Sequence, residues 1–190
     1  MKKIMFNDRY GLTQAVLKWQ KTVTRRIMNR QPDPDDIAYM EPKDYPCQPP
    51  YKVGEIVAVA QRYQELDNEW CRNHVGVHPA ESPYSSCENM AGWNNKMFVR
   101  AEACKHQIRI TSVHPERLQD ITDEDCLKEG LEWQHGANMF YVNYNRTNNS
   151  RELLGDTPRE AFASLIDKIS GRGTWERNPF VWRIEFKLVK

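Results

Sequence analysis

Residues 180–189 alternate between large apolar side chains and mostly polar ones. The apolar positions that share one face are Phe180, Trp182, Ile184, Phe186 and Leu188. A period of two residues places successive side chains on opposite faces of a strand. The pattern therefore predicts one long closing strand whose apolar face lies in a hydrophobic core.

Shorter patterns predict the other elements. Apolar or β-branched runs predict strands over 21–27, 56–60, 97–99 and 108–113. Apolar side chains at three- and four-residue steps, or capping boxes that begin at Thr122 and Thr157, predict helices. The predicted helices cover 10–19, 123–129 and 158–170.

The order of these elements indicates the fold class. Strands and helices do not alternate regularly, as they would in a doubly wound parallel sheet. We therefore expect an α+β fold, a small mixed β-barrel with a few peripheral helices. A length of 190 residues suits a single domain over 1–190. A proline-rich surface loop over 31–50 and a long loop insertion at about 64–95 complete the prediction.

Composition narrows the compartment and the partners. The formal net charge is +1, so a site for anions must be local. No apolar run approaches the length of a membrane helix, and the first residues lack the apolar part of a signal peptide. The 5 cysteines form no tight framework, which suits free thiols in a reducing compartment. A cytoplasmic protein without membrane contact is expected.

A local cluster of cationic and hydroxyl side chains follows the first predicted helix. Its members are Lys21, Thr22, Thr24, Arg25 and Arg26. Guanidinium forks and an ammonium are suited to phosphate or other anionic groups. The alternative is a solvated edge strand on which cations only discourage aggregation.

Glu129 is a second candidate residue. A carboxylate in the last turn of the helix predicted over 123–129 opposes the helix macrodipole. A nearby cation, such as Lys21 or an arginine, would compensate it. The alternative is an exposed Glu129 beside Lys128, screened by solvent.

Four residues in the predicted insertion have zinc-ligand chemistry. They are Cys71, His74, His78 and Cys87. Their spacing matches no common zinc finger, so the polar loop with incidental thiols is favoured and no metal is expected. Glycine-rich phosphate loops, nucleophile elbows and zincin helices are missing from the sequence, so no cofactor is expected either.

Several motifs together resemble ASCH-domain proteins, a PUA-like family with many members carried by phages. They are residues 3–8 (KIMFND), 21–27 (KTVTRRI), 51–55 (YKVGE), 116–122 (ERLQDIT), 129–130 (EG) and 178–182 (NPFVW). The resemblance implies a PUA-like β-barrel. It also implies a basic Lys-Thr-Arg cleft that receives RNA or a modified nucleoside.

A small bacterial member of that family removes the acetyl group from N4-acetylcytidine. By this resemblance Lys21 is the base, Thr24 the nucleophile and Glu129 the carboxylate that orients the pair, with Arg26 beside the oxyanion. The chain differs from the family by having Trp19 and Gln20 where a glycine usually precedes the basic pair.

Three functions are therefore considered. The first is binding of RNA or a nucleoside through Lys21, Thr22, Thr24, Arg25 and Arg26. The second is an amidohydrolase that deacetylates N4-acetylcytidine with Lys21, Thr24 and Glu129. The third is a phage accessory protein that binds a host protein through the 64–95 insertion.

Overall fold

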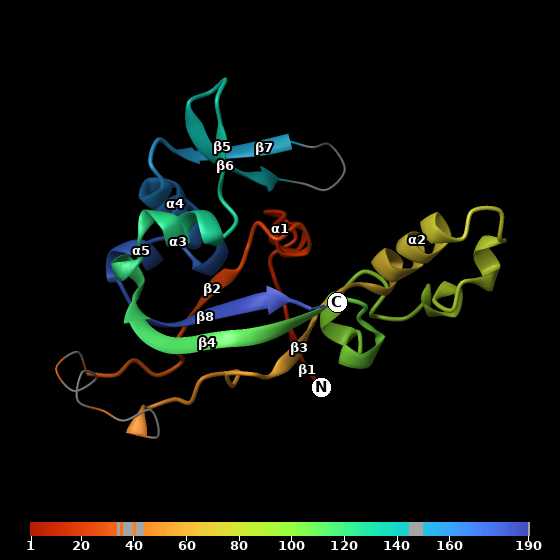
Figure 1. The fold of residues 1–190 in the computed structure, drawn as a ribbon, viewed down its shortest axis with the longest axis horizontal. Helices are drawn as coiled ribbons and strands as arrows, with labels where there is room; N and C mark the ends of the chain where they lie inside the picture. The colour runs from red at the N-terminus through yellow and green to blue at the C-terminus, as the bar shows by residue number, and fades with distance from the viewer. Residues whose placement is uncertain (34, 36–39, 41–43, 145–149, 190) are drawn as a thin grey trace. The chain divides into compact units, whose positions relative to one another are not determined.

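The computed structural model describes residues 1–33, 35, 40, 44–144 and 150–189, and its ribbon is drawn in Figure 1. The described chain is a mixed α+β fold with two sheets, which confirms the predicted α+β class. The pairings between described residues do not close either sheet into the expected β-barrel. In order of hydrogen bonding, the larger sheet is β1-β3-β4-β8-β2 and the smaller is β5-β6-β7. In the pairings between described residues, β1 and β2 stand at the two ends of the larger order. Two compact units can be distinguished, and each is described by itself.

The first unit combines Met1–Phe6, Ile56–Arg109 and the chain end from Leu188. Strand β1 (Lys2–Ile4) pairs in parallel with β3 (Ile56–Val59), and β3 pairs in antiparallel fashion with the first residues of β4 (Gln107–Arg117). The side chains of Val57, Ala58 and Val59 are fully buried. An apolar run without polar alternation therefore forms a strand that is covered on both faces.

The predicted insertion in this unit does lie between two strands, but part of it is helical. Helix α2 (Tyr63–Asn73) begins at Arg62, whose side chain pairs with Glu65. Single 3₁₀ turns follow at Pro79–Glu81, Ser85–Cys87, Lys96–Phe98 and Ala101–Ala103. The strand predicted over 97–99 is therefore wrong. The Asn95 side chain accepts a hydrogen bond from the Met97 backbone N–H, which begins a 3₁₀ turn in place of a strand.

The second unit combines Asn7–Glu55 with Ile110–Lys187. Strand β2 (Val23–Ile27) runs antiparallel to β8 (Phe180–Leu188), with Val23 opposite Glu185 and Ile27 opposite Val181. The predicted closing strand is confirmed, and Phe180, Trp182, Ile184 and Phe186 are all buried. Val181 is buried as well, so the first residues of β8 are covered on both faces of the sheet.

Within its described residues, the second unit contains the three predicted helices and a short fourth helix, α5, that was not predicted. They are α1 (Leu12–Leu17), α3 (Asp123–Lys128), α4 (Pro158–Ser170) and α5 (Thr174–Arg177). The hydroxyls of Thr122 and Thr157 accept hydrogen bonds from the Asp125 and Glu160 amides at 3.2 Å, as both capping boxes predict. Helix α4 buries Ala161, Phe162, Leu165 and Ile166, and it packs against α3, α5 and the small sheet.

The small sheet was not predicted. It consists of β5 (Glu132–Gln134), β6 (Met139–Tyr144) and β7 (Ser150–Gly155), joined as antiparallel neighbours. Tyr141, Val142 and Leu154 are among its buried side chains. Over the described residues, none of the helices has the length and apolar character needed to cross a membrane.

Candidate functional site

The segment that contains Lys21 is fixed by backbone hydrogen bonds at the end of α1. The Lys21 amide donates to the Ala15 carbonyl at 3.0 Å, and the Thr22 amide donates to the Lys128 carbonyl at 2.9 Å. Lys21 and Glu129 form an isolated β-bridge. The start of β2 is therefore joined directly to the end of α3, although the two segments are more than 100 residues apart in sequence.

Glu129 is held at the C-terminal cap of α3, and the next residue has to be a glycine. Gly130 has a φ of +101°, in the region that side chains disfavour. A β-carbon there would stand 3.3 Å from the Ala15 β-carbon and 3.5 Å from the Lys21 β-carbon. The missing side chain lets the end of α3 approach Lys21 closely enough for the two residues to pair.

Lys21 and Glu129 form a buried ion pair. The Lys21 amine donates to the Glu129 backbone carbonyl at 2.9 Å and also to the Glu129 carboxylate. The two side chains are only 1% and 6% exposed. Burial lowers the pKa of Lys21, and the attraction of Glu129 offsets that effect only in part. The expected cation that compensates Glu129 at the helix end is thus present.

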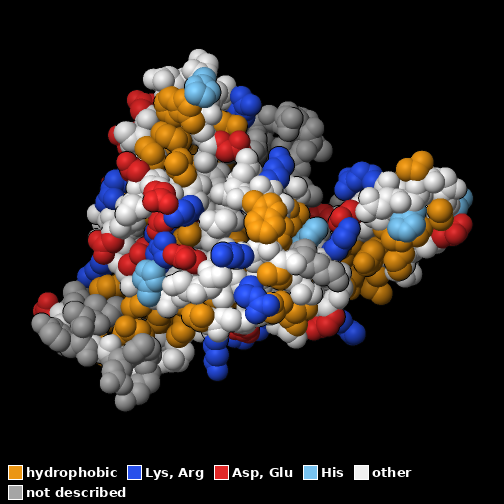
Figure 2. Space-filling view, viewed as in Figure 1, with side chains coloured by type: hydrophobic (Ala, Val, Ile, Leu, Met, Phe, Trp, Pro, Cys, Tyr) orange, Lys and Arg blue, Asp and Glu red, His pale blue; other side chains and the backbone are white. Residues whose placement is uncertain are grey.

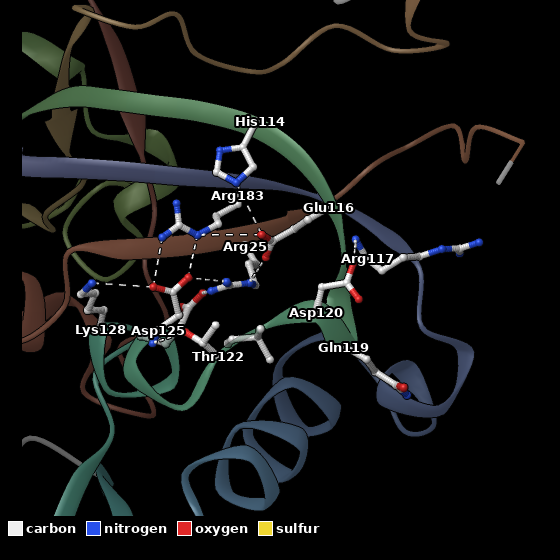
Figure 3. Close-up of polar contacts among 12 residues, drawn as sticks. Arg25, His114, Glu116, Arg117, Gln119, Asp120, Thr122, Asp125, Lys128 and Arg183 are labelled. Carbon is white, nitrogen blue, oxygen red and sulfur yellow. Dashed lines mark hydrogen bonds and ion pairs between the residues drawn. The ribbon is translucent and has the colours of Figure 1, made fainter. Parts of the chain in front are cut away.

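Arg25 is surrounded by carboxylates. Its Nε donates to Glu116 at 2.6 Å, its Nη2 to Asp125 at 2.8 Å and its Nη1 to Glu129 at 3.2 Å. Figure 3 shows the guanidinium of Arg25 in contact with Glu116 and Asp125. The side chain is 1% exposed, so its charge is neutralised inside the protein.

Arg183 completes this network from the neighbouring strand. The register of β2 and β8 sets Arg25 opposite Arg183, and Asp125 lies between the two guanidinium groups (Figure 3). Arg183 donates to Asp125 from Nε at 2.6 Å and from Nη2 at 3.0 Å. Burial would raise the pKa of Asp125, but the hydrogen bonds from Arg183 and Arg25 outweigh it and lower that pKa to about 2.

Six side chains thus form what we call the buried charge cluster. They are Lys21, Arg25, Arg183, Glu116, Asp125 and Glu129. Three cations meet three carboxylates, so the cluster has no formal net charge. Arg25, one of the two arginines predicted to bind a ligand, uses its donors within this cluster.

The other predicted site residues lie next to members of the buried charge cluster along the chain. Thr24 lies opposite Ile184 on β2 and is 5% exposed. Among the described residues, the hydroxyls of Thr22 and Thr24 make no hydrogen bond. Arg26 is half-buried; burial lowers its pKa, while Tyr51 and Glu129 act in the opposite direction. Lys21, Arg25 and Glu129 are therefore in direct contact, and Thr24 and Arg26 are neighbours along the strand.

Three members of the cluster were not predicted as site residues. In the sequence, Asp125 lies within the helix predicted over 123–129, Glu116 within a family motif and Arg183 at a polar position of the predicted closing strand. No local spacing singles them out, because contacts between segments far apart in the chain bring them together.

The four residues with zinc-ligand chemistry do not form a metal site. His74 stacks on Trp70 with 4.3 Å between ring centroids, and His78 accepts a hydrogen bond from the Ala80 amide. Throughout the part of the chain that the structure describes, no three or more His, Cys, Asp or Glu side chains gather as a metal ion would require. Cys71 and Cys87 are free thiols.

The Lys21–Glu129 pair has the features of a general base. A neutral amine has two donors and one lone pair, and Glu129 can accept both donors through its backbone carbonyl and its carboxylate. The lone pair of a neutral amine is the group that accepts a hydroxyl proton in general-base catalysis. Burial lowers the pKa of Lys21 while Glu129 fixes the position of its amine, and these are two features of a lysine that acts as a general base.

Comparisons of the chain with protein-family profiles, with curated proteins and with solved structures found no match.

Proposed function

We propose that the chain hydrolyses the exocyclic amide of an acylated pyrimidine nucleoside, of which N4-acetylcytidine is the type. We also propose that its larger sheet belongs to an ASCH-type, PUA-like fold. The observation that carries the functional proposal is the Lys21 amine, which is buried, lowered in pKa and hydrogen-bonded to Glu129. Desolvation of a lysine is a common way to obtain a base that works near neutral pH.

Thr24 supplies the nucleophile in this proposal. It lies three residues after Lys21, is nearly buried, and its hydroxyl proton is not committed to another described residue. The neutral amine of Lys21 accepts that proton as Thr24 Oγ bonds to the amide carbonyl carbon. The carbon–nitrogen bond then breaks, and the Lys21 ammonium returns the proton to the leaving nitrogen. The products are cytidine and an acetyl ester of Thr24.

Water completes the cycle. Lys21 takes one proton from the water as its oxygen bonds to the ester carbon. The bond between that carbon and Thr24 Oγ breaks, and the proton passes to the threonine oxygen. Acetic acid leaves and the hydroxyl is restored, so the balance requires only substrate and water.

Glu129 and Arg25 act as positioning residues. Glu129 holds the amine in place through two hydrogen bonds, and Arg25 holds the second carboxylate oxygen of Glu129 at 3.2 Å. Because both partners are buried, their rotamers are restricted before a ligand arrives. Arg26, whose guanidinium is within electrostatic reach of Glu129, is the candidate to stabilise the oxyanion.

The same geometry argues against RNA phosphate as the principal ligand. Phosphate recognition requires guanidinium donors that face outward. Arg25 directs its donors to three carboxylates and is 1% exposed. A neutral acylated base, with the cations serving to organise the site, fits the observed burial better.

Incubation with N4-acetylcytidine tests the proposal, with cytidine and acetate measured by chromatography. Wild type should release the two products in equal amounts. Lys21→Met and Thr24→Val should lower kcat/KM by roughly 10²–10⁴-fold. Since only the neutral amine accepts a proton, kcat/KM should rise with pH and level off below the ordinary lysine pKa of 10.5.

Lys168→Met is the matched control, because Lys168 lies on α4 and pairs with Glu152 of the small sheet, outside the buried charge cluster. It should leave turnover unchanged. Thr24→Val preserves the buried ion pair, so its folding should be intact and its loss of activity can be assigned to the hydroxyl. Absence of turnover by wild type, or full activity in Thr24→Val, would refute the hydrolase.

A further inference from the structure

Trp19 occupies a position at the end of α1 that favours glycine. The Gln20 amide donates to the Ala15 carbonyl at 2.9 Å, and the Trp19 amide donates to the Val16 carbonyl at 3.0 Å. These two hydrogen bonds define a Schellman motif, in which the residue after the C-cap is left-handed. Trp19 is that residue, and its φ is +63°. A large side chain in this conformation is strained.

The strained side chain is also exposed. Trp19 is 60% exposed, whereas the other five tryptophans are half-buried or buried. No ring contact or hydrogen bond joins the indole of Trp19 to any residue that the structure describes. Hydrophobic surface is visible over α1, beside Lys and Arg side chains (Figure 2). Packing therefore does not explain why tryptophan stands at a glycine position.

The position of Trp19 next to the site offers an explanation. Trp19 is two positions before Lys21 along the chain, so their α-carbons are about 7 Å apart at most. The Gln20 and Lys21 amides both donate to the Ala15 carbonyl, so the turn that carries the indole is tied to the segment that carries the base. Strain of this kind persists where the surrounding structure enforces it, and it is characteristic of functional sites.

We propose that Trp19 is the base-stacking residue of the site. Its indole would receive the face of a pyrimidine ring while the acylated exocyclic nitrogen reaches Lys21. This inference rests on the proposed function and adds the group that recognises the base. An exposed indole presents a flat, polarisable ring, which stacks on nucleobases independently of phosphate.

Binding of cytidine tests the inference independently of turnover, because cytidine is the product and is not consumed. Trp19→Gly should weaken the Kd for cytidine about tenfold. It should also raise the Tm by about 2–4 °C, because glycine relieves the left-handed strain. Trp19→Phe should fall between wild type and Trp19→Gly in affinity. The tryptophan emission that Trp19→Phe removes should be the emission that cytidine quenches in wild type.

Trp133→Phe is the matched control, because Trp133 is half-buried against Phe140 at 4.7 Å on the small sheet. It should leave the cytidine Kd unchanged, and ribose, which has no base, should quench nothing. An unchanged cytidine Kd in Trp19→Gly would overturn the stacking role. A Tm that falls in Trp19→Gly would overturn the backbone strain from which that role is argued.

The two proposals fail in different ways. Cytidine binding that depends on Trp19, without hydrolysis of N4-acetylcytidine, would refute the hydrolase and support the stacking residue. Hydrolysis of N4-acetylcytidine that persists unchanged in Trp19→Gly would support the hydrolase and refute the stacking residue.

Discussion

At the scale of single residues, the buried charges are balanced pair by pair. Arg25 and Arg183 lie directly opposite each other on neighbouring strands, an arrangement that is unfavourable for like charges. Asp125 accepts hydrogen bonds from both guanidinium groups and so makes the arrangement stable. These contacts could not be predicted from the sequence, since Arg25 is 91 to 104 residues from its three carboxylate partners. The spacing of residues within a short segment does not indicate which distant residues will form ion pairs.

Asp125 should make stability depend on pH in a defined window. The pKa of Asp125 is about 2 in the folded protein, compared with 3.8 for an ordinary aspartate. Its contribution to the free energy of unfolding is therefore complete above about pH 4 and is lost as pH falls towards 2. The shift corresponds to about 2 kcal/mol. Asp125→Asn should be less stable than wild type at pH 7, and the difference should shrink by about this amount between pH 4 and 2. Urea unfolding at several pH values measures it.

Asp123→Asn is the control for this experiment, because Asp123 is exposed on the same helical turn. Its difference from wild type should stay nearly constant over that window. A constant difference for Asp125→Asn as well would mean that Arg25 and Arg183 do not stabilise the Asp125 carboxylate.

At the scale of elements, prediction succeeded where a cap or a long alternation was present. Thr122, Thr157 and the pattern of 180–189 gave α3, α4 and β8 with nearly correct bounds. Helix α2 was missed because its sequence is polar and buries only Leu66, although Tyr63, Leu66 and Trp70 have helical spacing. In α2 the polar composition favoured a loop, although a short apolar stripe indicated a helix.

The candidate site was predicted in part for the same reason. Lys21 and Glu129 each drew attention through local chemistry, a cationic cluster and a carboxylate at a helix end. Their contact depends on Gly130, and the effect of a missing side chain on the approach of two segments cannot be inferred from spacing alone. The strained Trp19 likewise follows from the hydrogen bonds of a turn, not from residue type.

Gly130→Ala should show how much the approach of α3 to Lys21 contributes. The new β-carbon would have a disfavoured φ and a 3.3 Å contact with Ala15, so we expect a loss of about 2–3 kcal/mol in the free energy of unfolding. Gly171→Ala is the control, with a φ of +106° and nothing within 4 Å of the added carbon. Urea unfolding should find Gly130→Ala the more destabilising by about 1 kcal/mol. Equal losses would show that packing at the site is loose.

At the scale of the whole molecule, the chain has little net charge to attract a polyanion. It contains 27 Lys and Arg against 26 Asp and Glu, and the buried charge cluster is itself neutral. On the face shown in Figure 2, Lys and Arg side chains are interspersed with Asp and Glu. Proteins that bind nucleic acid through its backbone concentrate positive charge on a surface. The distribution of charge therefore favours a ligand recognised through its base.

Salt dependence tests that conclusion on the whole protein. Binding to each phosphate releases counterions, and the logarithm of the affinity falls with the logarithm of the salt concentration by about 0.7 per contact on a single strand.

Cytidine, which has no phosphate, should bind with a Kd that changes less than about twofold between 50 and 500 mM salt. A single-stranded RNA that contains cytidine should show a slope no steeper than about −1.4, which corresponds to two contacts. Arg26→Gln should make that slope shallower by about 0.7, as expected for the loss of one contact. Lys168→Gln, whose ammonium pairs with Glu152 on the small sheet, should leave the slope unchanged. A slope near −4 for the RNA would indicate an extended backbone site and would contradict recognition through the base.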